Sequence, residues 1–390
     1  MKILQAIPFF APKFGGTVTS VFLLSKELAK RGHKVTIITS DLDYDKNYVQ
    51  TLEASGVELI PFHNVANYGL FIHTPSIKPW LWNNVKNYDV IHMHNFRSHQ
   101  FSLLTKYAIE NNIPTILQAR GTVLPFFEKQ LLKHLFDGVW GYKILKNVSK
   151  VIALCESEAE QYRTMGVPEN KIVIIPNGLD VSQFSNFPVK GVFRSKYHIS
   201  KDEIVILFLG RIHKIKGIDI LIHAYADLLK EIPNTRLVIA GPEDSYLSVI
   251  KDQIQREKPE NMPLFTGPLY GQEKIAAYID SDIFVLPSRH DAFPNTILEA
   301  WACGTPVIVT KGCLIADIVE KAGYVSDLDA NELKETIKTV LTDETRRMKN
   351  VHTGLELIKN EFNLTSCLDK MEKIYQDTIT EKKMKIRGNE

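Results

Sequence analysis

Short apolar runs rich in valine and isoleucine alternate with segments of helical periodicity along the first half of the chain. These runs cover residues 2–7, 35–39, 57–62, 90–93, 115–118, 151–154 and 172–175. Short uninterrupted apolar runs are typical of strands that are buried on both faces, as in parallel sheets. The pattern therefore predicts an α/β domain built on a parallel sheet.

The first helix of this domain is predicted to follow the pair Gly15-Gly16 directly. Its apolar residues share one helical face: Val18, Val21, Leu24 and Leu28. Arg31 and Gly32 then provide a basic last turn and a glycine stop. Together with the apolar runs on either side, this helix forms a predicted βαβ unit.

The periodicity lapses between residues 176 and 200, where glycine, proline, serine and asparagine are frequent, and this stretch is interpreted as a linker. Beyond it, strands are predicted at residues 204–209, 236–240, 264–266, 283–286 and 307–309. Helices are predicted near residues 218–229, 246–257 and 296–302. Two consecutive parallel α/β domains follow from this repetition.

Length and composition fit that arrangement. A chain of 390 residues can bury two cores, and a formal charge of +2 gives no overall reason to expect nucleic acid as a partner. The four cysteines are far apart with no CxxC pair, so neither a zinc site nor a disulfide framework is expected, and a reducing cytoplasmic setting fits. No stretch of about 18 apolar residues is present, so no segment is expected to span a bilayer.

Two cations follow the first strand of the second domain. Arg211 and Lys216 stand in the segment 210–217, directly after a predicted strand end. In open α/β sheets, ligands bind outside the carboxyl ends of the strands, so both side chains are expected at a crevice. Arginine offers a planar fork and lysine a compact charge, which are two complementary ways to hold phosphate oxygens. A solvated basic loop is the competing interpretation.

Two carboxylates follow a later strand of the same domain. Asp291 precedes a helix whose start is indicated by Pro294 and Asn295, and Glu299 lies about one turn inside it. The amides near Asn295 and Thr296 are then free to bind an anion, Glu299 can accept hydrogen bonds from a ribose diol, and Asp291 can reach sugar hydroxyls. Acidic residues in a first turn are also ordinary helix-dipole partners. Cations at one strand end and carboxylates at another together favour a nucleotide sugar as ligand.

These features resemble family 4 of the retaining glycosyltransferases, which have the GT-B fold. Four features match in order and cover nearly the whole chain: the Gly15-Gly16 turn, the Val-Ile-His-Met-His run that ends at His94, the Arg211 and Lys216 pair, and Asp291 with Glu299 at the two positions of the family's Glu-x7-Glu motif.

The resemblance implies an α/β GT-B architecture of two facing Rossmann-like domains with a deep interdomain cleft. Residues 1–185 are then expected to form the acceptor-binding domain and residues 186–363 the nucleotide-sugar-binding domain. Residues 364–390 are expected to hold a helix, about 364–378, that crosses back to the first domain, followed by a frayed tail.

The resemblance also implies the roles of single residues. Gly16 lets the donor approach the backbone, and His94 faces the donor sugar, whereas His92 is interpreted as a core or loop histidine. The implied catalytic residues are His94 and Asp291. The implied donor site comprises Gly15, Gly16, Arg211, Lys216, Phe293, Pro294, Asn295, Thr296, Leu298 and Glu299. The family commonly has glutamate where this chain has Asp291 and glycine where it has Ala292, which puts the sugar contact in question.

The implied reaction is transfer with retention of anomeric configuration and without a metal. Arg211, Lys216 and the helix N-terminus would stabilise the leaving diphosphate, and that phosphate would help to deprotonate the acceptor hydroxyl on the same face. The acceptor is expected to be a glycan or a lipid-linked molecule. Arg120, just after a predicted strand, is a weak candidate for acceptor binding, and a structural salt bridge is an equal alternative.

A basic, aromatic segment precedes residue 150. It interleaves apolar and basic side chains: Phe126, Phe127, Leu131, Leu135, Phe136 and Trp140 with Lys129, Lys133, His134, Lys143 and Lys146. Such a helix can rest on an anionic membrane and meet a lipid-linked acceptor. The interpretation that we favour by a small margin is a helix that covers the core, with its lysines simply solvated.

Other functions remain open. The tripeptides Asp41-Leu42-Asp43 and Asp43-Tyr44-Asp45 have the DxD form of metal-dependent, single-domain glycosyltransferases, although that architecture predicts no second α/β domain. A sugar-nucleotide epimerase can share the GT-B architecture, and a catalytically silent nucleotide-sugar-binding module is a third alternative. No GxGxxG follows the first strand and no GxxxxGK[ST] loop is present, which disfavours redox dinucleotide enzymes and NTP hydrolysis.

Overall fold

A computed structural model describes residues 1–67 and 72–387, with the side chains of residues 385–387 left out. The chain divides into two compact units. Unit 1 is Met1–Asn177 together with the segment from Cys367 onward, and unit 2 is Gly178–Ser366. The sequence placed these boundaries at residues 185 and 363. The division therefore comes eight residues earlier than predicted at the linker (185 − 177) and three later near the last helix (366 − 363).

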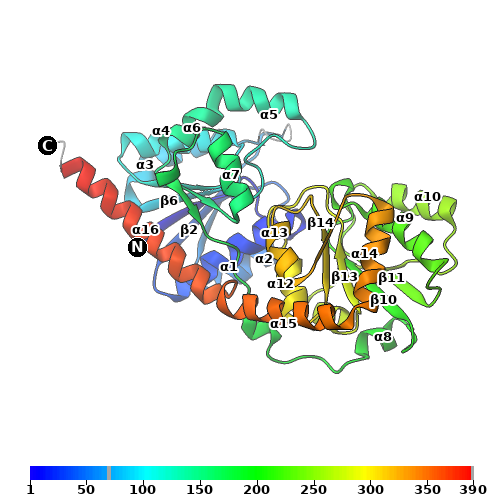
Figure 1. Cartoon of the computed structure of the whole chain (residues 1–390). Helices are drawn as coiled ribbons and strands as arrows, with labels where there is room; N and C mark the ends of the chain where they lie inside the picture. Colours follow the sequence, from blue (N-terminus) through cyan, green and yellow to red (C-terminus); the bar gives the residue numbers. More distant parts are fainter. Residues whose placement is uncertain (68–71, 388–390) are drawn as a thin grey trace. The chain divides into compact units, whose positions relative to one another are not determined.

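Unit 1 is built on a seven-stranded parallel sheet (Figure 1). The strands are β1 (Lys2–Ala6), β2 (Lys34–Ser40), β3 (Glu58–Phe62), β6 (Val90–His94), β7 (Thr115–Gln118), β8 (Lys150–Ala153) and β9 (Ile172–Ile174), in the order β3-β2-β1-β6-β7-β8-β9. All seven were predicted to within two residues at each end. The antiparallel pair β4 (Ala66–Asn67) and β5 (Ile72–His73) was not predicted, because two-residue strands carry no periodic signal.

The helices of unit 1 cover the two faces of this sheet. They are α1 (Gly16–Lys30), α2 (Lys46–Glu53), α3 (Ile77–Asn84), α4 (His99–Glu110), α5 (Gln130–Phe136), α6 (Tyr142–Asn147) and α7 (Glu156–Thr164). Helix α1 buries the four predicted apolar residues, so its orientation follows from its apolar stripe. Within the described ranges, no helix is long and apolar enough to cross a membrane.

The last helix, α16 (Leu364–Arg387), packs on unit 1 and extends beyond its predicted end at residue 378. Tyr375 of this helix is fully buried. Glu372 accepts hydrogen bonds from Arg31 at 2.5 Å and from the ring of His33 at 2.5 Å, both of which follow α1. The C-terminal segment therefore completes the core of the unit in which the chain begins.

Unit 2 repeats the architecture with a six-stranded parallel sheet. Its strands are β10 (Ile204–Leu209), β11 (Thr235–Ala240), β12 (Leu264–Gly267), β13 (Ile283–Leu286), β14 (Val307–Thr310) and β15 (Tyr324–Ser326), in the order β12-β11-β10-β13-β14-β15. Its helices are α8 (Val192–Lys196), α9 (Ile218–Leu229), α10 (Leu247–Glu257), α11 (Gly271–Ile279), α12 (Asn295–Ala302), α13 (Ala316–Ala322), α14 (Ala330–Thr342) and α15 (Glu344–Asn360). The edge strand β15 was not predicted from the sequence.

Both sheets contain a point where the strand order reverses. In unit 1, β1 lies between β2 and β6; in unit 2, β10 lies between β11 and β13. The connections on either side of such a point run to opposite faces of the sheet, which leaves a crevice at the carboxyl ends of the two central strands. The crevices are therefore expected after β1 and β6 in unit 1 and after β10 and β13 in unit 2.

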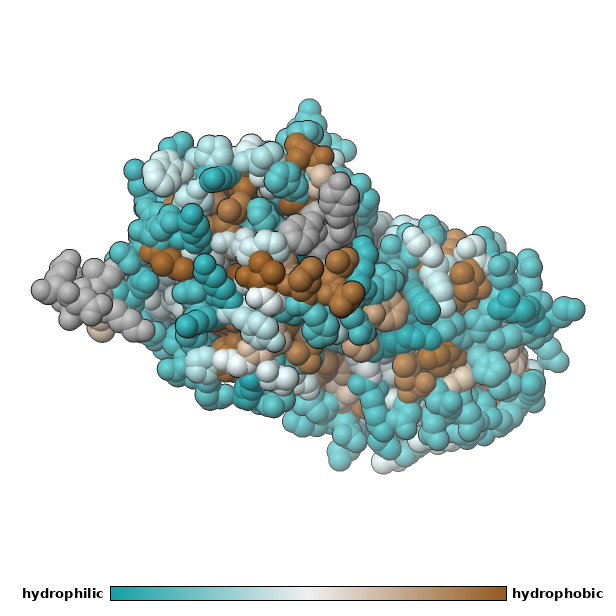
Figure 2. All heavy atoms as spheres, turned by 90° about the horizontal axis from the view of Figure 1, so that it is seen from above, coloured by the Kyte–Doolittle hydropathy of each residue, from teal (hydrophilic) through white to brown (hydrophobic). Residues whose placement is uncertain are grey.

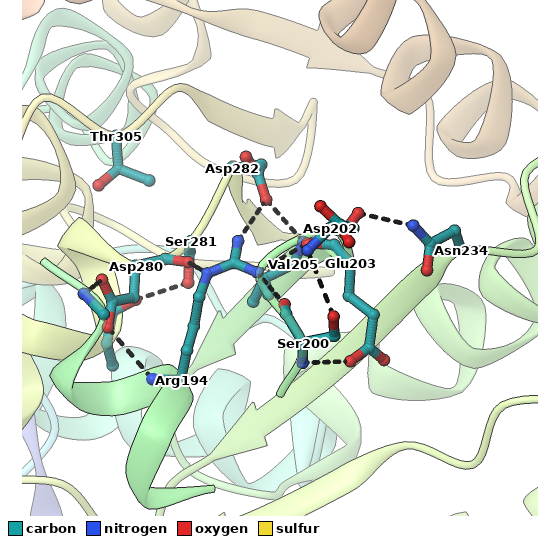
Figure 3. A network of polar contacts seen from close by, with 12 residues as sticks. Arg194, Ser200, Asp202, Glu203, Val205, Asn234, Asp280, Ser281, Asp282 and Thr305 are labelled. Carbon is teal, nitrogen blue, oxygen red and sulfur yellow. Dashed lines mark hydrogen bonds and ion pairs between the residues drawn. The ribbon is translucent and has the colours of Figure 1, made fainter. Parts of the chain in front are cut away.

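A polar network closes the opposite edge of the unit 2 sheet, where β10 and β13 begin (Figure 3). Arg194 of α8 donates to the carbonyls of Asp280, Ser200 and Glu203 at 2.7 to 3.0 Å and to the carboxylate of Asp282 at 2.9 Å. The Asp280 carboxylate in turn accepts from the backbone amides at the start of α8. This network fixes the segment that enters unit 2 and lies away from the carboxyl ends of the strands.

Candidate functional site

The loop after β10 brings two cations against the end of β13. Arg211 and Lys216 both belong to it, and the loop ends in Gly217, whose backbone has φ of 68°. A Cβ atom at Gly217 would lie 1.9 Å from the carbonyl oxygen of Pro287, which follows β13. Only glycine permits this approach, so Gly217 sets how closely Lys216 lies to the second strand end.

Lys216 forms an ion pair with Asp291, which belongs to the loop after β13. Both side chains are mostly buried, with 15% and 17% of their surface exposed. The backbone of Asp291 is fixed on both sides, because its amide donates to Gly312 at 3.1 Å and its carbonyl accepts from Leu314 at 2.8 Å. The predicted cation and the predicted carboxylate therefore meet at the switch point of unit 2.

Arg211 is paired with a residue that sequence reasoning missed. Its guanidinium donates to the Asp244 carboxylate at 2.5 Å, and about a third of each side chain is exposed. Asp244 follows β11, the neighbour of β10, so its loop lies at the same edge of the sheet. Loop aspartates are frequent after strands, and only the strand order distinguishes this one.

Glu299 of α12 is held by two side chains of α11. Its carboxylate accepts from Lys274 at 2.6 Å and from the Tyr278 hydroxyl at 3.1 Å. Burial, and then the nearby Glu299 charge, raises the pKa of Tyr278 well above its usual value, so this hydroxyl keeps its proton. Lys274 and Tyr278 were not predicted, although their i, i+4 spacing places both on one face of α11.

The start of α12 divides the remaining predicted donor residues into two groups. Asn295 and Thr296, at the helix start, are partly exposed, and Pro294 at the N-cap makes no side-chain capping bond. Phe293 and Leu298 are buried, and the Phe293 ring lies edge-on to Phe362 with centroids 5.7 Å apart. The side chains of Phe293 and Leu298 therefore pack in the core. Only Asn295, Thr296 and the backbone at the helix start remain to contact a ligand.

In unit 1, Gly15 and Gly16 lie at the other predicted crevice. Gly15 has φ of 79° and is the N-cap of α1, a conformation that favours glycine. A Cβ atom at Gly16 would have no neighbour within 4 Å. The fold therefore requires glycine at Gly15 but leaves open space at Gly16, where the α1 amides begin.

His94 ends β6 and is fully buried. Gln5 Oε1 lies 2.5 Å from Nε2 of His94, and Arg120 Nε donates to Nδ1 over 3.3 Å. Because an amide oxygen only accepts and a guanidinium only donates, Nε2 carries the proton and Nδ1 is the acceptor. Burial, followed by the nearby His92 and Arg120, holds the pKa of His94 well below its usual value, so the imidazole is neutral.

His92 shares a strand face with His94, because β6 stays regular to its end, and the two ring centroids are 4.0 Å apart. It is fully buried, in agreement with its interpretation as a core histidine. Its Nδ1 lies 2.8 Å from the Tyr375 hydroxyl, which also receives a hydrogen bond from Gln5 at 3.3 Å. Sequence reasoning missed Gln5 and Tyr375, which link the last helix to both histidines.

Arg120 is partly buried and adjoins this network through His94. Its φ is 53°, and it donates to Asn177 at 2.9 Å as well as to His94. Burial lowers the pKa of Arg120 to about 10, although the nearby Glu158 charge opposes that shift. Among the described residues, its side-chain hydrogen bonds go to these two neutral partners, which disfavours the alternative of a structural salt bridge.

The three aspartates of the DxD-like tripeptides each have a local structural role. Asp41 accepts from the ring of His63 at 2.7 Å, and Asp43 pairs with Lys13 at 2.6 Å. Asp45 caps α2 by accepting from the Tyr48 amide at 3.0 Å. These contacts explain the tripeptides as loop and cap residues.

Two Rossmann-like units of this kind define the class of the GT-B glycosyltransferases. The crystal structure of Anabaena Alr3699/HepE in complex with UDP and glucose matches the chain with a TM-score of 0.79 at 18% identity, covering 97% of this chain and all of that one. The fold is therefore GT-B.

The chain belongs to the family 4, or group 1, glycosyltransferases and is a glycosyltransferase. The family model described as Glycosyltransferase Family 4 matches residues 14–183, and the one described as Glycosyl transferases group 1 matches residues 189–356. Similar proteins include the D-inositol 3-phosphate glycosyltransferase of Kineococcus radiotolerans, 24% identical over 85% of this chain and 84% of that protein. The alpha-monoglucosyldiacylglycerol synthase of Streptococcus pneumoniae is 29% identical over 77% of this chain and 68% of its own length.

Proposed function

We propose that this protein transfers a sugar from a nucleotide-diphosphate sugar to a glycan or lipid-linked acceptor, with retention of anomeric configuration and without a metal ion. One observation carries the proposal. Lys216 of the loop after β10 and Asp291 of the loop after β13 form an ion pair at the switch point of unit 2, where an open α/β sheet binds its ligand; Arg211 belongs to the same first loop, and Glu299 to the helix that follows the second. A nucleotide sugar needs both chemistries, since its diphosphate is anionic and its ribose and sugar carry hydroxyls.

The proposed step breaks the bond between the anomeric carbon and the diphosphate oxygen, and the electron pair stays on that oxygen. Arg211 and Lys216 stabilise the developing charge, and the amides at the start of α12 add two donors. The acceptor oxygen bonds to the anomeric carbon on the same face, and its proton passes to the leaving diphosphate. Neither an enzymic nucleophile nor a metal takes part in this scheme.

Asp291 connects the diphosphate and the sugar in this scheme. Without ligand, its carboxylate neutralises Lys216. A diphosphate oxygen that reaches Lys216 competes with this pairing, and the displaced carboxylate is then available to accept hydrogen bonds from sugar hydroxyls. Glu299, held by α11, is proposed to accept from the ribose.

Two comparisons support the donor and acceptor classes. Structures of the similar Anabaena protein contain UDP, glucose or UDP-glucose, which supports a nucleotide sugar as donor. The name of the Streptococcus relative specifies an alpha-linked glucolipid, which supports a lipid-linked acceptor, and the name of the Kineococcus relative specifies glycosyl transfer to an inositol phosphate. An alpha-linked product is also what retention yields from an alpha-linked nucleotide sugar.

A panel of UDP-, GDP- and ADP-sugars tests this function, with EDTA present throughout. Calorimetry measures binding, and mass spectrometry measures donor turnover and its products. Selective binding with turnover in EDTA is the expected result. Turnover that requires added Mg²⁺ would contradict the metal-free scheme, isomerised donor without transfer would favour an epimerase, and binding without turnover across an acceptor panel would favour a silent module.

A further inference from the structure

An 18-residue helical segment of unit 1 has one face in the core and an apolar face in solvent. It runs from Gln130 to Asn147 through α5, a five-residue π-helix (Asp137–Gly141) and α6. The inner face is buried and consists of Phe136, Asp137, Gly141, Ile144 and Leu145. The interpretation of this segment as a core cover therefore holds for its inner face.

A buried ion pair anchors the segment. Arg97, which follows β6, donates to both carboxylate oxygens of Asp137 at 2.9 and 2.6 Å, and both side chains are almost fully buried. A Cβ atom at Gly141 would lie 2.7 Å from the Asp137 carboxylate, so this turn of the π-helix is shaped around the pair. Breaking a buried pair is strongly destabilising, so the segment is held firmly in its register.

The outer face of the same segment exposes large apolar side chains. Leu131 is 83% exposed and Leu135 is 63% exposed. The remaining exposed apolar residues of this face are Leu132, Val139 and Tyr142. Figure 2, which views the chain from above Figure 1 and so onto the side of unit 1 that carries α5, shows hydrophobic side chains gathered there beside hydrophilic ones. Contiguous exposed apolar surface marks an interaction site more often than an isolated leucine does.

The charges around this face are predominantly positive. Lys129 precedes α5, and Lys143 and Lys146 follow Val139 and Tyr142 at helical spacing, all three exposed. Of the two acidic residues nearby, Glu128 is exposed and Asp137 is neutralised by Arg97. Lys133 is only partly exposed and its ammonium donates to the Phe126 carbonyl at 2.6 Å, so it is not one of the exposed lysines of this surface.

We propose that this outer face, formed by Leu131, Leu132, Leu135, Val139 and Tyr142 with Lys129, Lys143 and Lys146, docks on the surface of an anionic lipid bilayer. We call it the α5 surface. Its leucines would enter the boundary between headgroups and acyl chains, and its lysines would lie along their apolar stems with their ammonium groups at the anionic headgroups. A second copy of the chain fits this face less well, since a two-fold contact would bring the lysines of both copies together.

Flotation with vesicles tests the proposal, using the full chain and no sugar substrate. Vesicles of phosphatidylcholine alone are compared with vesicles that also contain phosphatidylglycerol. We expect binding to the anionic vesicles, weakened by added salt. The triple variant Lys129→Gln, Lys143→Gln, Lys146→Gln should bind them on the order of 100-fold more weakly. The double variant Leu131→Gln, Leu135→Gln should lose binding to a similar extent.

Matched variants on unit 2 test whether vesicle binding depends on where the substituted residues lie or only on the charge and apolar surface that is removed. Lys251→Gln, Lys258→Gln and Lys349→Gln together remove the same charge from exposed positions and should leave vesicle binding unchanged. Met348→Gln removes an exposed apolar side chain outside the α5 surface and should do the same. Equal loss in these variants, equal binding to both vesicle types, or no vesicle binding would each overturn the proposal. A dimer in ultracentrifugation that the Leu131→Gln, Leu135→Gln variant abolishes would assign this face to a second copy instead.

The result does not depend on the proposed reaction. A protein that turns over no sugar nucleotide can still bind anionic vesicles through this surface. Conversely, loss of vesicle binding in the leucine variant, with turnover of a water-soluble donor unchanged, would support the surface and show that the donor site is intact.

Discussion

Lys216 and Asp291 are 75 residues apart in the chain and form an ion pair between the loops that follow β10 and β13. The pair exists because β10 and β13 are neighbours in the sheet although β11 and β12 lie between them in sequence. A diphosphate that binds Lys216 must therefore compete with a carboxylate already in place. Donor binding at Lys216 would therefore release the Asp291 carboxylate from the ion pair.

Lys216→Ala should lower donor turnover by about 100- to 1000-fold, the usual cost of removing one preorganised donor at a developing oxyanion. The fold should survive, because Asp291 keeps access to water and its backbone is fixed by Gly312 and Leu314. Turnover by mass spectrometry and thermal unfolding measure the two effects. Lys214→Ala, an exposed lysine in the same loop, is the matched control. Near-normal turnover in purified Lys216→Ala would remove this residue from the site.

Asp291→Glu should change the donor preference more than the stability. One added methylene moves the carboxylate toward the sugar, and a single methylene in a binding pocket typically changes kcat/KM by about 10- to 200-fold. Asp291→Asn keeps the size of the side chain but loses its charge. It therefore distinguishes the effect of side-chain length from the effect of the ion pair with Lys216. The measurement is the ratio of kcat/KM for two sugars on the same nucleotide. If that ratio is the same in all three proteins, Asp291 does not contact the sugar.

Glu299→Gln should raise the KM for the donor, because a hydrogen bond to a charged acceptor is worth about 1.5 to 3 kcal/mol. Its specific signature is a loss of discrimination between the natural donor and analogues that lack one ribose hydroxyl. Tyr278→Phe removes a partner of Glu299 without touching its charge and should have a smaller effect. Full discrimination retained in Glu299→Gln would mean that the carboxylate serves only its contacts with Lys274 and Tyr278.

The sequence predicted what depends on local pattern. Strand β10 and helix α9 were predicted with their observed ends, because each is a long apolar or strongly periodic run between clear stops. Strands β4 and β5 were missed because they are only two residues long, and β15 because its three residues, Tyr324–Ser326, lack the apolar run that marked the equally short β9. Helix α16 was predicted too short, since its solvated last turns have no apolar stripe to mark them.

The partners of the candidate site could not be predicted in this way. Gln5 and Tyr375 are 370 residues apart and meet only because α16 returns to unit 1. Asp244 and Lys274 look like ordinary loop and helix charges until the strand order places them beside Arg211 and Glu299. Residues directly after a strand could be identified from the sequence, because a strand end is visible in the local pattern. Their partners could not, because the order of the strands in the sheet decides which loops meet.

Arg194→Met should destabilise unit 2 by about 3 kcal/mol and leave the donor KM unchanged. Its guanidinium serves three carbonyls and the Asp282 carboxylate, which lose their donor together (Figure 3). The network lies at the edge of the sheet where β10 and β13 begin, opposite the candidate site. Urea unfolding and donor kinetics measure the two effects. Arg346→Met, which removes a guanidinium that lies over the ring of Tyr324, 4.6 Å from its centroid, should cost less than about 1 kcal/mol. An altered KM in Arg194→Met would mean that this edge communicates with the site.

The buried histidines of β6 should make the protein less stable as the pH falls below their ordinary pKa. The pKa of His92 is held well below the ordinary histidine value of 6.5, first by burial and then by the nearby Arg120 charge, and burial likewise lowers the pKa of His94. Above pH 6.5, His92 and His94 are neutral in the folded and in the unfolded chain. Below pH 6.5, the two histidines of the unfolded chain bind protons that those of the folded chain do not.

Each histidine therefore reduces the free energy of unfolding by up to about 1.4 kcal/mol per pH unit in that range. Urea unfolding of the wild type and His92→Gln, compared between about pH 7.5 and pH 5.5, isolates one histidine from the carboxylates that also titrate there. The variant should lose less stability than the wild type on acidification, while His352→Gln, exposed on α15, should follow the wild type. Parallel curves for His92→Gln and the wild type would mean that His92 takes up its proton in the folded state.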